Sequence, residues 1–289
     1  MADLAHDRVN FCYRHAQRQS FVLCQRCGQT VCGECQTPAP VGVICPSCIQ
    51  GQRKTGITRP SLVTRWRRRA EASDAPVVTY AIIAITVVMY LLQLVPVLRV
   101  TELLYYEPAY STPAYSEPWR MLTVLFVHSS LIFHVLLNMY TLLVLGRMLE
   151  PMLGRWRFLA LYFIAGLGGS VGVLWFSELG NGAVVGASGA LFGVMGALLV
   201  IQRRLGGPTV QLLVLVGINL ALGFFVPTIS WQAHVGGLLT GLLLGLILVE
   251  TRANHRQRLQ PWLMTGLTLV LIVLSLRYFV FPVGPLGLG

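Results

Sequence analysis

A serine and a histidine stand in two separate apolar stretches of the sequence, where polar side chains are costly. Ser188 lies in a Gly-Ala-Ser-Gly segment at residues 186–189, and His234 lies in an Ala-His-Val-Gly-Gly segment at residues 233–237. The flanking residues predict that each lies roughly one turn inside an apolar helix. A serine hydroxyl beside an imidazole can act as a nucleophile with its general base. Because an ionisable group within a membrane span is a functional candidate by default, the pair predicts nucleophilic catalysis inside a membrane.

Both residues also have an ordinary structural explanation. A serine in a membrane helix commonly bonds back to a carbonyl one turn earlier, and a buried histidine can be a satisfied core residue. Gly186 and Gly189 favour catalysis, because they allow close backbone approach and leave amide groups near the helix start free to face an oxyanion. Small-residue faces at 189–193 and 237–245 would bring the two helices together, although ordinary packing needs the same geometry.

Two further polar residues share one face of an earlier apolar stretch. His134 and Asn138 are spaced i and i+4, so they project from the same side of a helix. Both side chains can donate hydrogen bonds to an oxyanion. A plain hydrogen bond between helices is the alternative interpretation of this pair.

The remaining residue types exclude other proteolytic mechanisms within the membrane. No cysteine follows Cys48, the aspartates are confined to residues 3, 7 and 74, and no histidine is followed by the glutamate that a His-Glu-x-x-His zinc site requires. Serine with histidine is what remains. We expect a dyad in which packing orients the imidazole, because the apolar stretches lack an acidic third member. Glu178, at the outer end of a span, is the one acid that is not excluded as a third member.

Composition predicts an all-α polytopic membrane protein. Only 11% of the 289 residues are charged, and the mean hydropathy is +0.66. Seven apolar runs are long enough to cross about 30 Å of hydrocarbon as helices, although the fourth and fifth are short. The expected spans are residues 76–98, 127–148, 157–177, 187–203, 209–226, 231–250 and 261–281.

Arginines predict the orientation of these spans in the cell membrane. Arginine-rich links precede span one and follow spans two, four and six, whereas the other links are acidic or neutral. By the positive-inside rule, the amino terminus is cytoplasmic and the carboxyl terminus lies outside. The net charge of +11 therefore indicates cytoplasmic loops beside a lipid bilayer rather than nucleic-acid binding. This topology puts His134, Ser188 and His234 at similar depths near the outer face.

Seven cysteines and one histidine form four regular pairs near the amino terminus. Two residues separate the members of each pair, so both side chains can bind one ion. Eight ligands suffice for two closed, structural Zn²⁺ sites; an iron–sulfur cluster or unrelated cysteines are the alternatives. Residues 1–50 are the expected zinc-binding domain, and residues 51–75 are a basic linker. The pairs are Cys12 with His15, Cys24 with Cys27, Cys32 with Cys35, and Cys45 with Cys48.

The spacing of these pairs resembles a cross-braced B-box-type zinc finger. That resemblance implies that the first and third pairs share one ion and that the second and fourth pairs share the other. The sequence alone also allows neighbouring pairs to share an ion. It leaves open whether the finger recruits substrates, binds a protein partner or regulates the rest of the chain.

Residues 75–250 resemble the rhomboid family of intramembrane serine proteases. The resemblance implies a six-helix bundle over residues 76–250 and one added helix within residues 251–289, a 6+1 arrangement. The amino-terminal finger resembles that attached to some bacterial rhomboids. The matching features are Trp119-Arg120, His134-x-x-x-Asn138, the segment 186–189, and Ala233-His234-x-x-Gly237-x-x-x-Gly241.

The same resemblance implies roles for individual residues, with no cofactor for catalysis. Ser188 would be the nucleophile, and His234 would be the general base and later the acid. His134, Asn138 and the Ser188 amide would form the oxyanion hole. Many rhomboids carry a tyrosine one turn after the serine, where this chain has Phe192. A phenyl ring can still stack on the histidine, but the hydroxyl is lost.

The implied substrates are single-span membrane proteins, cut near their outer end where the substrate helix unwinds. Trp119 and Arg120 would help to order the outer loop. Two other classes of function compete with this interpretation. A catalytically silent relative would bind or escort membrane proteins, and a transporter with a regulatory zinc domain would show ionisable groups near mid-membrane and repeated halves.

Overall fold

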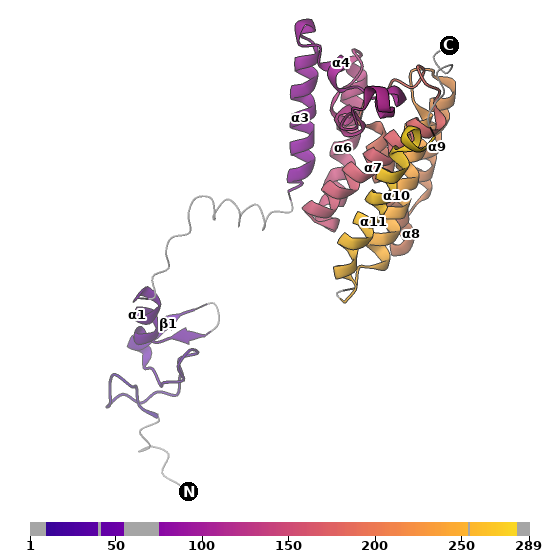
Figure 1. The fold of residues 1–289 in the computed structure, drawn as a ribbon. Coiled ribbons are helices and arrows are strands. Elements are labelled where there is room, and N and C mark those ends of the chain that lie inside the picture. Colours follow the sequence, from indigo (N-terminus) through magenta and orange to yellow (C-terminus); the bar gives the residue numbers. More distant parts are fainter. Residues whose placement is uncertain (1–9, 40–41, 55–74, 254, 282–289) are drawn as a thin grey trace. The chain divides into compact units, whose positions relative to one another are not determined.

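The chain divides into two compact units, Met1–Ser73 and Asp74–Gly289. The computed structural model describes residues 10–39, 42–54, 75–253 and 255–281 (Figure 1). The boundary between the units falls inside the stretch predicted as a basic linker, most of which lies outside the described residues. The four expected catalytic residues lie in helices of the second unit, and the expected metal ligands lie in the first.

The first unit has little regular structure within its described residues. It contains the 3-10 turn η2 (Gly33–Cys35), strands β1 (Thr37–Pro38) and β2 (Val43–Ile44), and helix α1 (Pro46–Lys54). The two strands are antiparallel, with Thr37 opposite Ile44. Its buried core consists of Val31 and five cysteines. So small an apolar core cannot hold a fold by itself, which makes a metal cross-link the expected source of stability.

The described residues of the second unit form helices joined by loops (Figure 1). Short helices between α3 and α6 form the segment that the sequence predicted as an outer loop, a name kept for it below, and the long helices follow it. The outer loop contains η3 (Pro96–Leu98), α4 (Val100–Leu104), η4 (Pro108–Ser111), η5 (Pro113–Tyr115), α5 (Arg120–Thr123) and η6 (Val124–Phe126). The other helices are α3 (Val77–Gln93), α6 (Ile132–Leu153), α7 (Arg155–Phe176), α8 (Ser188–Leu205), α9 (Val210–Phe225), α10 (Trp231–Glu250), η7 (Gln257–Leu259), α11 (Gln260–Ser275) and α12 (Arg277–Val280).

Fewer helices of the described residues are long and apolar enough to cross a membrane alone than the seven spans that the sequence predicted. Among the described residues, five helices are long and apolar enough: α6, α7, α8, α10, and α11 together with η7. A sixth results if α3 and the segment Pro96–Leu104, bent by 104°, count as one span. An apolar helix also stands at the fifth predicted position, but α9 has only 16 residues. That is about 24 Å of helix, shorter than the hydrocarbon core. The chain is a polytopic membrane protein by these helices, and the 6+1 arrangement remains a prediction.

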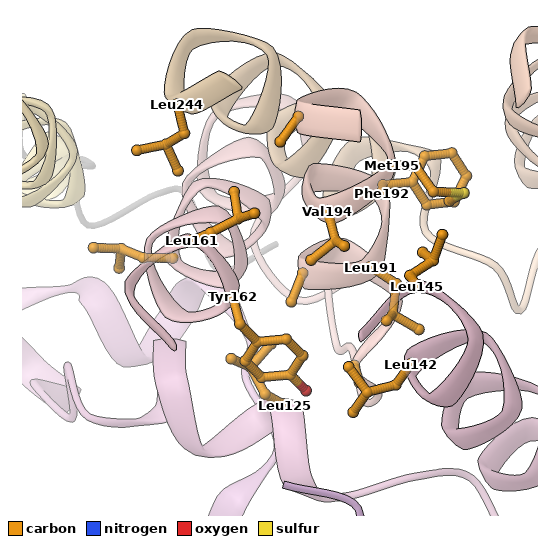
Figure 2. Close-up of a cluster of buried hydrophobic side chains, with 14 of the residues drawn as sticks. Leu125, Leu142, Leu145, Leu161, Tyr162, Leu191, Phe192, Val194, Met195 and Leu244 are labelled. Carbon is orange, nitrogen blue, oxygen red and sulfur yellow. The ribbon is translucent and has the colours of Figure 1, made fainter. Parts of the chain in front are cut away.

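Glycines allow the central helices to pack with their backbones in contact. Helix α10 lies against both α8 and α7. A Cβ added to Gly241 would overlap the carbonyl group of Gly193, and a Cβ on Gly236 would overlap the carbonyl oxygen of Gly168. Larger apolar side chains fill the space beside these contacts, among them Leu161, Val194 and Leu244 (Figure 2). Small residues at helix contacts are the usual way to bring membrane helices together.

A buried carboxylate joins the start of α3 to the end of α6. Glu150 is 2% exposed, and its two oxygens accept hydrogen bonds from the backbone amides of Val78 and Thr79, each at 2.8 Å. The hydroxyl of Thr79 donates a third, at 2.7 Å. The first amides of a helix have no partner within it, and a negative charge there is favourable. Glu150 therefore caps α3 from another helix.

Arg120 holds distant parts of the outer loop together. Its side chain is 7% exposed and pairs with Glu117, with 2.6 Å between Nε and Oε2. Nη1 donates to the carbonyl oxygens of Glu102, at 2.7 Å, and Tyr105, at 3.2 Å. The guanidinium carbon also lies 4.1 Å from the ring centroid of Tyr110. The planar guanidinium satisfies all of these partners at once.

Replacing Arg120 by leucine is expected to loosen the outer loop and to destabilise the protein by about 2–3 kcal/mol, because two backbone carbonyls and Glu117 lose their partner. Arg120→Lys should recover only part of the lost stability, since an ammonium group cannot form the same set of planar hydrogen bonds as a guanidinium. Hydrogen exchange of residues 100–123 and thermal unfolding in detergent measure both effects. Unchanged exchange in Arg120→Leu would contradict this role.

Candidate active site

Ser188 and His234 meet across two helices. The Oγ of Ser188 lies 3.0 Å from the Nε2 of His234, which is a hydrogen-bond distance. His234 is 5% exposed and lies at the end of the first turn of α10, roughly one turn inside the helix as the sequence predicted. Ser188 is the first residue of α8 rather than one turn inside it, contrary to the expectation from the sequence. The reason is local. Gly186, two residues before Ser188, has a φ of +119°, which no helical residue adopts, so the helix begins only after it.

The distance between the two side chains depends on the glycines beside them. A Cβ on Gly237, one turn after His234, would overlap the carbonyl oxygen of Gly189. A Cβ on Gly189 would lie 3.3 Å from the carbonyl oxygen of Ala233. The backbones of α8 and α10 therefore touch beside Ser188, and this contact is what lets a short serine side chain reach the imidazole.

Packing orients the imidazole of His234. The ring of Phe192 stacks on it, with centroids 4.1 Å apart and an interplanar angle of 15°. Within the described residues, the Nδ1 of His234 is buried and has no hydrogen-bond partner. Glu178, the acid that the sequence left open, is exposed and accepts no hydrogen bond from this ring. The pair is thus a serine and a histidine without a bonded carboxylate.

The four expected site residues line one cavity of about 950 Å³. His134 and Asn138 reach it from α6, and Asn138 is 7% exposed. The Nδ2 of Asn138 donates to the carbonyl oxygen of His134 at 2.8 Å, which leaves its second N–H available. Ser188, His234, Phe192 and Met195 line the same cavity. The structure therefore brings a hydroxyl, a proton acceptor and hydrogen-bond donors together.

Three polar residues near the expected site escaped the sequence analysis, and one of them, Ser129, lines the cavity. His128 and Ser129 were expected inside a helix over residues 127–148, but α6 begins only at Ile132, so both lie in a loop. His128 is 1% exposed, and its Nε2 accepts a hydrogen bond from the Ala187 amide at 3.4 Å. Gln93, at the end of α3, bonds the same loop. An ionisable residue within an expected span was the available signal for His128.

Comparison with known proteins finds one family that resembles part of the chain. Residues 115–251 match the sequence model of the family described as rhomboid domain. Similar proteins include RHOMBOID-like protein 6, mitochondrial, of Arabidopsis thaliana, 38% identical over 141 residues (46% of this chain, 45% of that protein). Rhomboid protease GluP of Bacillus subtilis is 35% identical over 187 residues (61% and 36%), and Rhomboid-type serine protease 2 of Emericella nidulans is 32% identical over 156 (51% and 30%). These matches support the rhomboid family.

The region that matches the rhomboid domain covers every helix that carries an expected catalytic residue. It runs from the outer loop to the end of α10, and so includes His134, Asn138, Ser188 and His234. Helix α3, the first unit and α11 lie outside it. The chain spans less than half the length of each of these three relatives.

The first unit brings its cysteines and histidine into two clusters, described here by themselves. In each cluster, the candidate ligand atoms all lie within 4.8 Å of one another. The clusters combine the first pair with the third and the second pair with the fourth. They are Cys12, His15, Cys32 and Cys35, and Cys24, Cys27, Cys45 and Cys48. Four converging sulfur or nitrogen atoms per cluster fit a tetrahedral ion.

Backbone hydrogen bonds favour the thiolate form of one cysteine in these clusters, Cys24. The amide of Cys27, and after it those of Arg26 and Cys45, donate toward the sulfur of Cys24, and burial opposes them only in part. Together they lower the pKa of the Cys24 thiol to about 6. Because the thiolate is the form that binds metal, this sulfur is prepared to act as a ligand near neutral pH.

Proposed function

We propose that this protein is an intramembrane serine endopeptidase in which Ser188 is the nucleophile and His234 the general base. The observation that carries the proposal is the 3.0 Å contact between Ser188 Oγ and His234 Nε2. Two groups that the sequence separates widely meet on neighbouring apolar helices, beside a cavity. The names of two relatives, a rhomboid protease and a rhomboid-type serine protease, support the same class of reaction.

The proposed reaction follows from which groups of the site can donate and accept a proton. His234 Nε2 accepts the proton of Ser188 as Oγ attacks the scissile carbonyl carbon, and the imidazolium then protonates the leaving amine. A water molecule, deprotonated by the same nitrogen, hydrolyses the acyl-enzyme. Because Ser188 is the first residue of α8, its amide has no partner within the helix and is available to the oxyanion. His134 and Asn138 supply further donors.

Single-span membrane proteins are the proposed substrates. A substrate helix has no free backbone amides or carbonyls until it unwinds, so the scissile bond must come from a segment that leaves the helix easily. We place the cut near the outer face of a cell membrane, with the amino terminus of the chain cytoplasmic, on the strength of the arginine pattern. The 6+1 arrangement of spans belongs to the same proposal.

Two structural Zn²⁺ ions in a B-box-like finger are the proposed occupants of the clusters in the first unit. Every ligand position is filled by a cysteine or histidine, so neither ion would keep an open position for catalysis. The finger is then a stable surface for a protein partner. Catalysis itself needs no cofactor.

A fluorophosphonate probe tests the serine directly. The purified chain in detergent is expected to become labelled, and Ser188→Ala and His234→Ala are expected to lose labelling, because one lacks the nucleophile and the other its base. Ser275→Ala, at a half-buried position, and His255→Ala, at an exposed one, are matched controls outside the cavity lining and should be labelled like the unchanged chain.

Cleavage of a model single-span protein in liposomes completes the test. The unchanged chain should cut it and both site variants should not. Binding without labelling or cleavage in folded protein would refute the protease and leave a silent membrane-protein scaffold, the competing function.

A further inference from the structure

We infer that the backbone amide of Ser129 fixes His134 in the neutral tautomer that carries its proton on Nε2, and that Gln93 positions this amide. Ser129 and Gln93 are thus positioning residues for an oxyanion donor. The catalytic consequence rests on the proposed function, whereas the tautomer itself can be measured without any activity.

The hydrogen bonds of His134 decide where its proton lies. The amide nitrogen of Ser129 is 3.3 Å from the Nδ1 of His134, and the Oγ of Ser129 is 3.0 Å from the same nitrogen. A backbone N–H can only donate. Nδ1 must therefore accept, and a neutral imidazole that accepts at Nδ1 carries its hydrogen on Nε2.

The protonated nitrogen faces the nucleophile segment. A Cβ built on Gly186 would lie 2.9 Å from His134 Nε2, so this nitrogen sits against the backbone two residues before Ser188. Both His134 and Ser188 line the cavity. In the opposite tautomer, Nε2 would present a lone pair to the oxyanion and repel it.

Helix α3 holds the loop that carries the Ser129 amide. The side-chain amide of Gln93 makes two hydrogen bonds with the backbone of His128: Oε1 accepts from the amide at 3.0 Å, and Nε2 donates to the carbonyl oxygen at 2.8 Å. Nε2 also donates to Thr101 Oγ1 at 2.8 Å. On the other side, the hydroxyl of Tyr90 donates to the carbonyl oxygen of Ser130 at 3.2 Å. Both neighbours of Ser129 are therefore tied to α3.

This arrangement gives α3 a part in the site although it lies outside the matched rhomboid region. Gln93 hydrogen-bonds both the N–H and the carbonyl oxygen of His128. These two bonds constrain the plane of the peptide group between His128 and Ser129. That peptide contains the amide of Ser129. If this peptide plane turned, the Ser129 amide would lose its hydrogen bond to Nδ1 of His134. No contact with substrate would be affected directly.

Nitrogen-15 NMR of histidine-labelled full chain in lipid bilayers tests the tautomer. The signals of His134 are assigned by their absence in His134→Ala. At neutral pH we expect an unprotonated Nδ1 and a protonated Nε2. The reverse pattern, or an imidazolium, would overturn the inference whether or not the chain cleaves any substrate.

Three variants separate the amide from the side chain. Ser129→Ala keeps the amide and should keep the tautomer, whereas Ser129→Pro removes the amide and should give a mixed pattern. Gln93→Met, which has a similar volume but cannot hydrogen-bond, should also give a mixed pattern and lower kcat by about tenfold or more with little change in KM. Gln211→Met, an exposed position on α9, is the matched control.

Thermal unfolding in detergent shows whether each variant is folded, and the NMR pattern is interpreted for folded variants. An unchanged pattern and kcat in Gln93→Met would overturn the role of Gln93. An unchanged tautomer in folded Ser129→Pro would overturn the role of the amide. If the tautomer is as expected but no variant of Ser188 alters labelling, the proposed function fails and the inference about His134 stands.

Discussion

Replacing Gly237 by valine is expected to separate α10 from α8 and to abolish both probe labelling and cleavage. Gly237 lies one turn after His234, and any Cβ there would overlap the carbonyl oxygen of Gly189, the residue next to Ser188. Backbone atoms cannot give way as a flexible side chain can. We expect a destabilisation at the upper end of overpacking effects, about 3 kcal/mol or more, together with a longer distance between Ser188 and His234.

The matched control for this change is Gly217→Val on α9. A Cβ at Gly217 would meet nothing within 4 Å, so the same substitution in another apolar helix should leave labelling and thermal unfolding nearly unchanged. Gly237→Ala should be intermediate in stability. A Gly237→Val protein that unfolds and labels like the unchanged chain would show that the helices do not meet as described.

Removal of metal is expected to unfold the first unit while leaving the second unit folded. The core of the first unit is Val31 and five cysteines, so little apolar burial would remain without the ions. Structural zinc binding contributes on the order of 10 kcal/mol or more in small fingers, which is more than so small a fold can replace. The second unit has its own core of buried apolar side chains (Figure 2).

Elemental analysis and hydrogen exchange measure this result. The full chain should contain two Zn²⁺ ions, and a strong chelator should remove the protection of residues 10–54 without changing that of residues 75–253. Cys32→Ser should lose one ion, and Thr37→Ala, at an exposed position that offers no ligand, should keep both. Protection that survives complete removal of metal would contradict a metal-dependent fold.

Hydropathy was sufficient to predict most of the helices and little of what joins them. Helix α10 has the predicted bounds, residues 231–250, because an uninterrupted apolar run leaves few alternatives. The start of the second predicted span was wrong, since residues 127–131 form a loop. Its backbone is bonded by Gln93 and Tyr90, far earlier in the chain, and a local apolar pattern contains no information about such partners.

Residue types alone nominated Ser188 and His234, because few other reactive groups occur in the apolar helices. Their spacing across α8 and α10 is a tertiary property and needed the structure. The predicted span of residues 187–203 starts within one residue of α8, but the sequence did not show that the chain turns at Gly186 and makes Ser188 the first helical residue. The catalytic roles themselves remain predictions.

The cap that Glu150 places on α3 implies an order of assembly during synthesis. Ribosomes make α3 well before the end of α6, so the amides of Val78 and Thr79 have no carboxylate partner when α3 first reaches the membrane. Until residue 150 emerges, water or lipid headgroups must satisfy them, and α3 is free to slide or tilt. Arrival of Glu150 ends that freedom. A nascent chain stopped short of this residue should therefore hold α3 loosely, and one that extends past it should hold α3 in register.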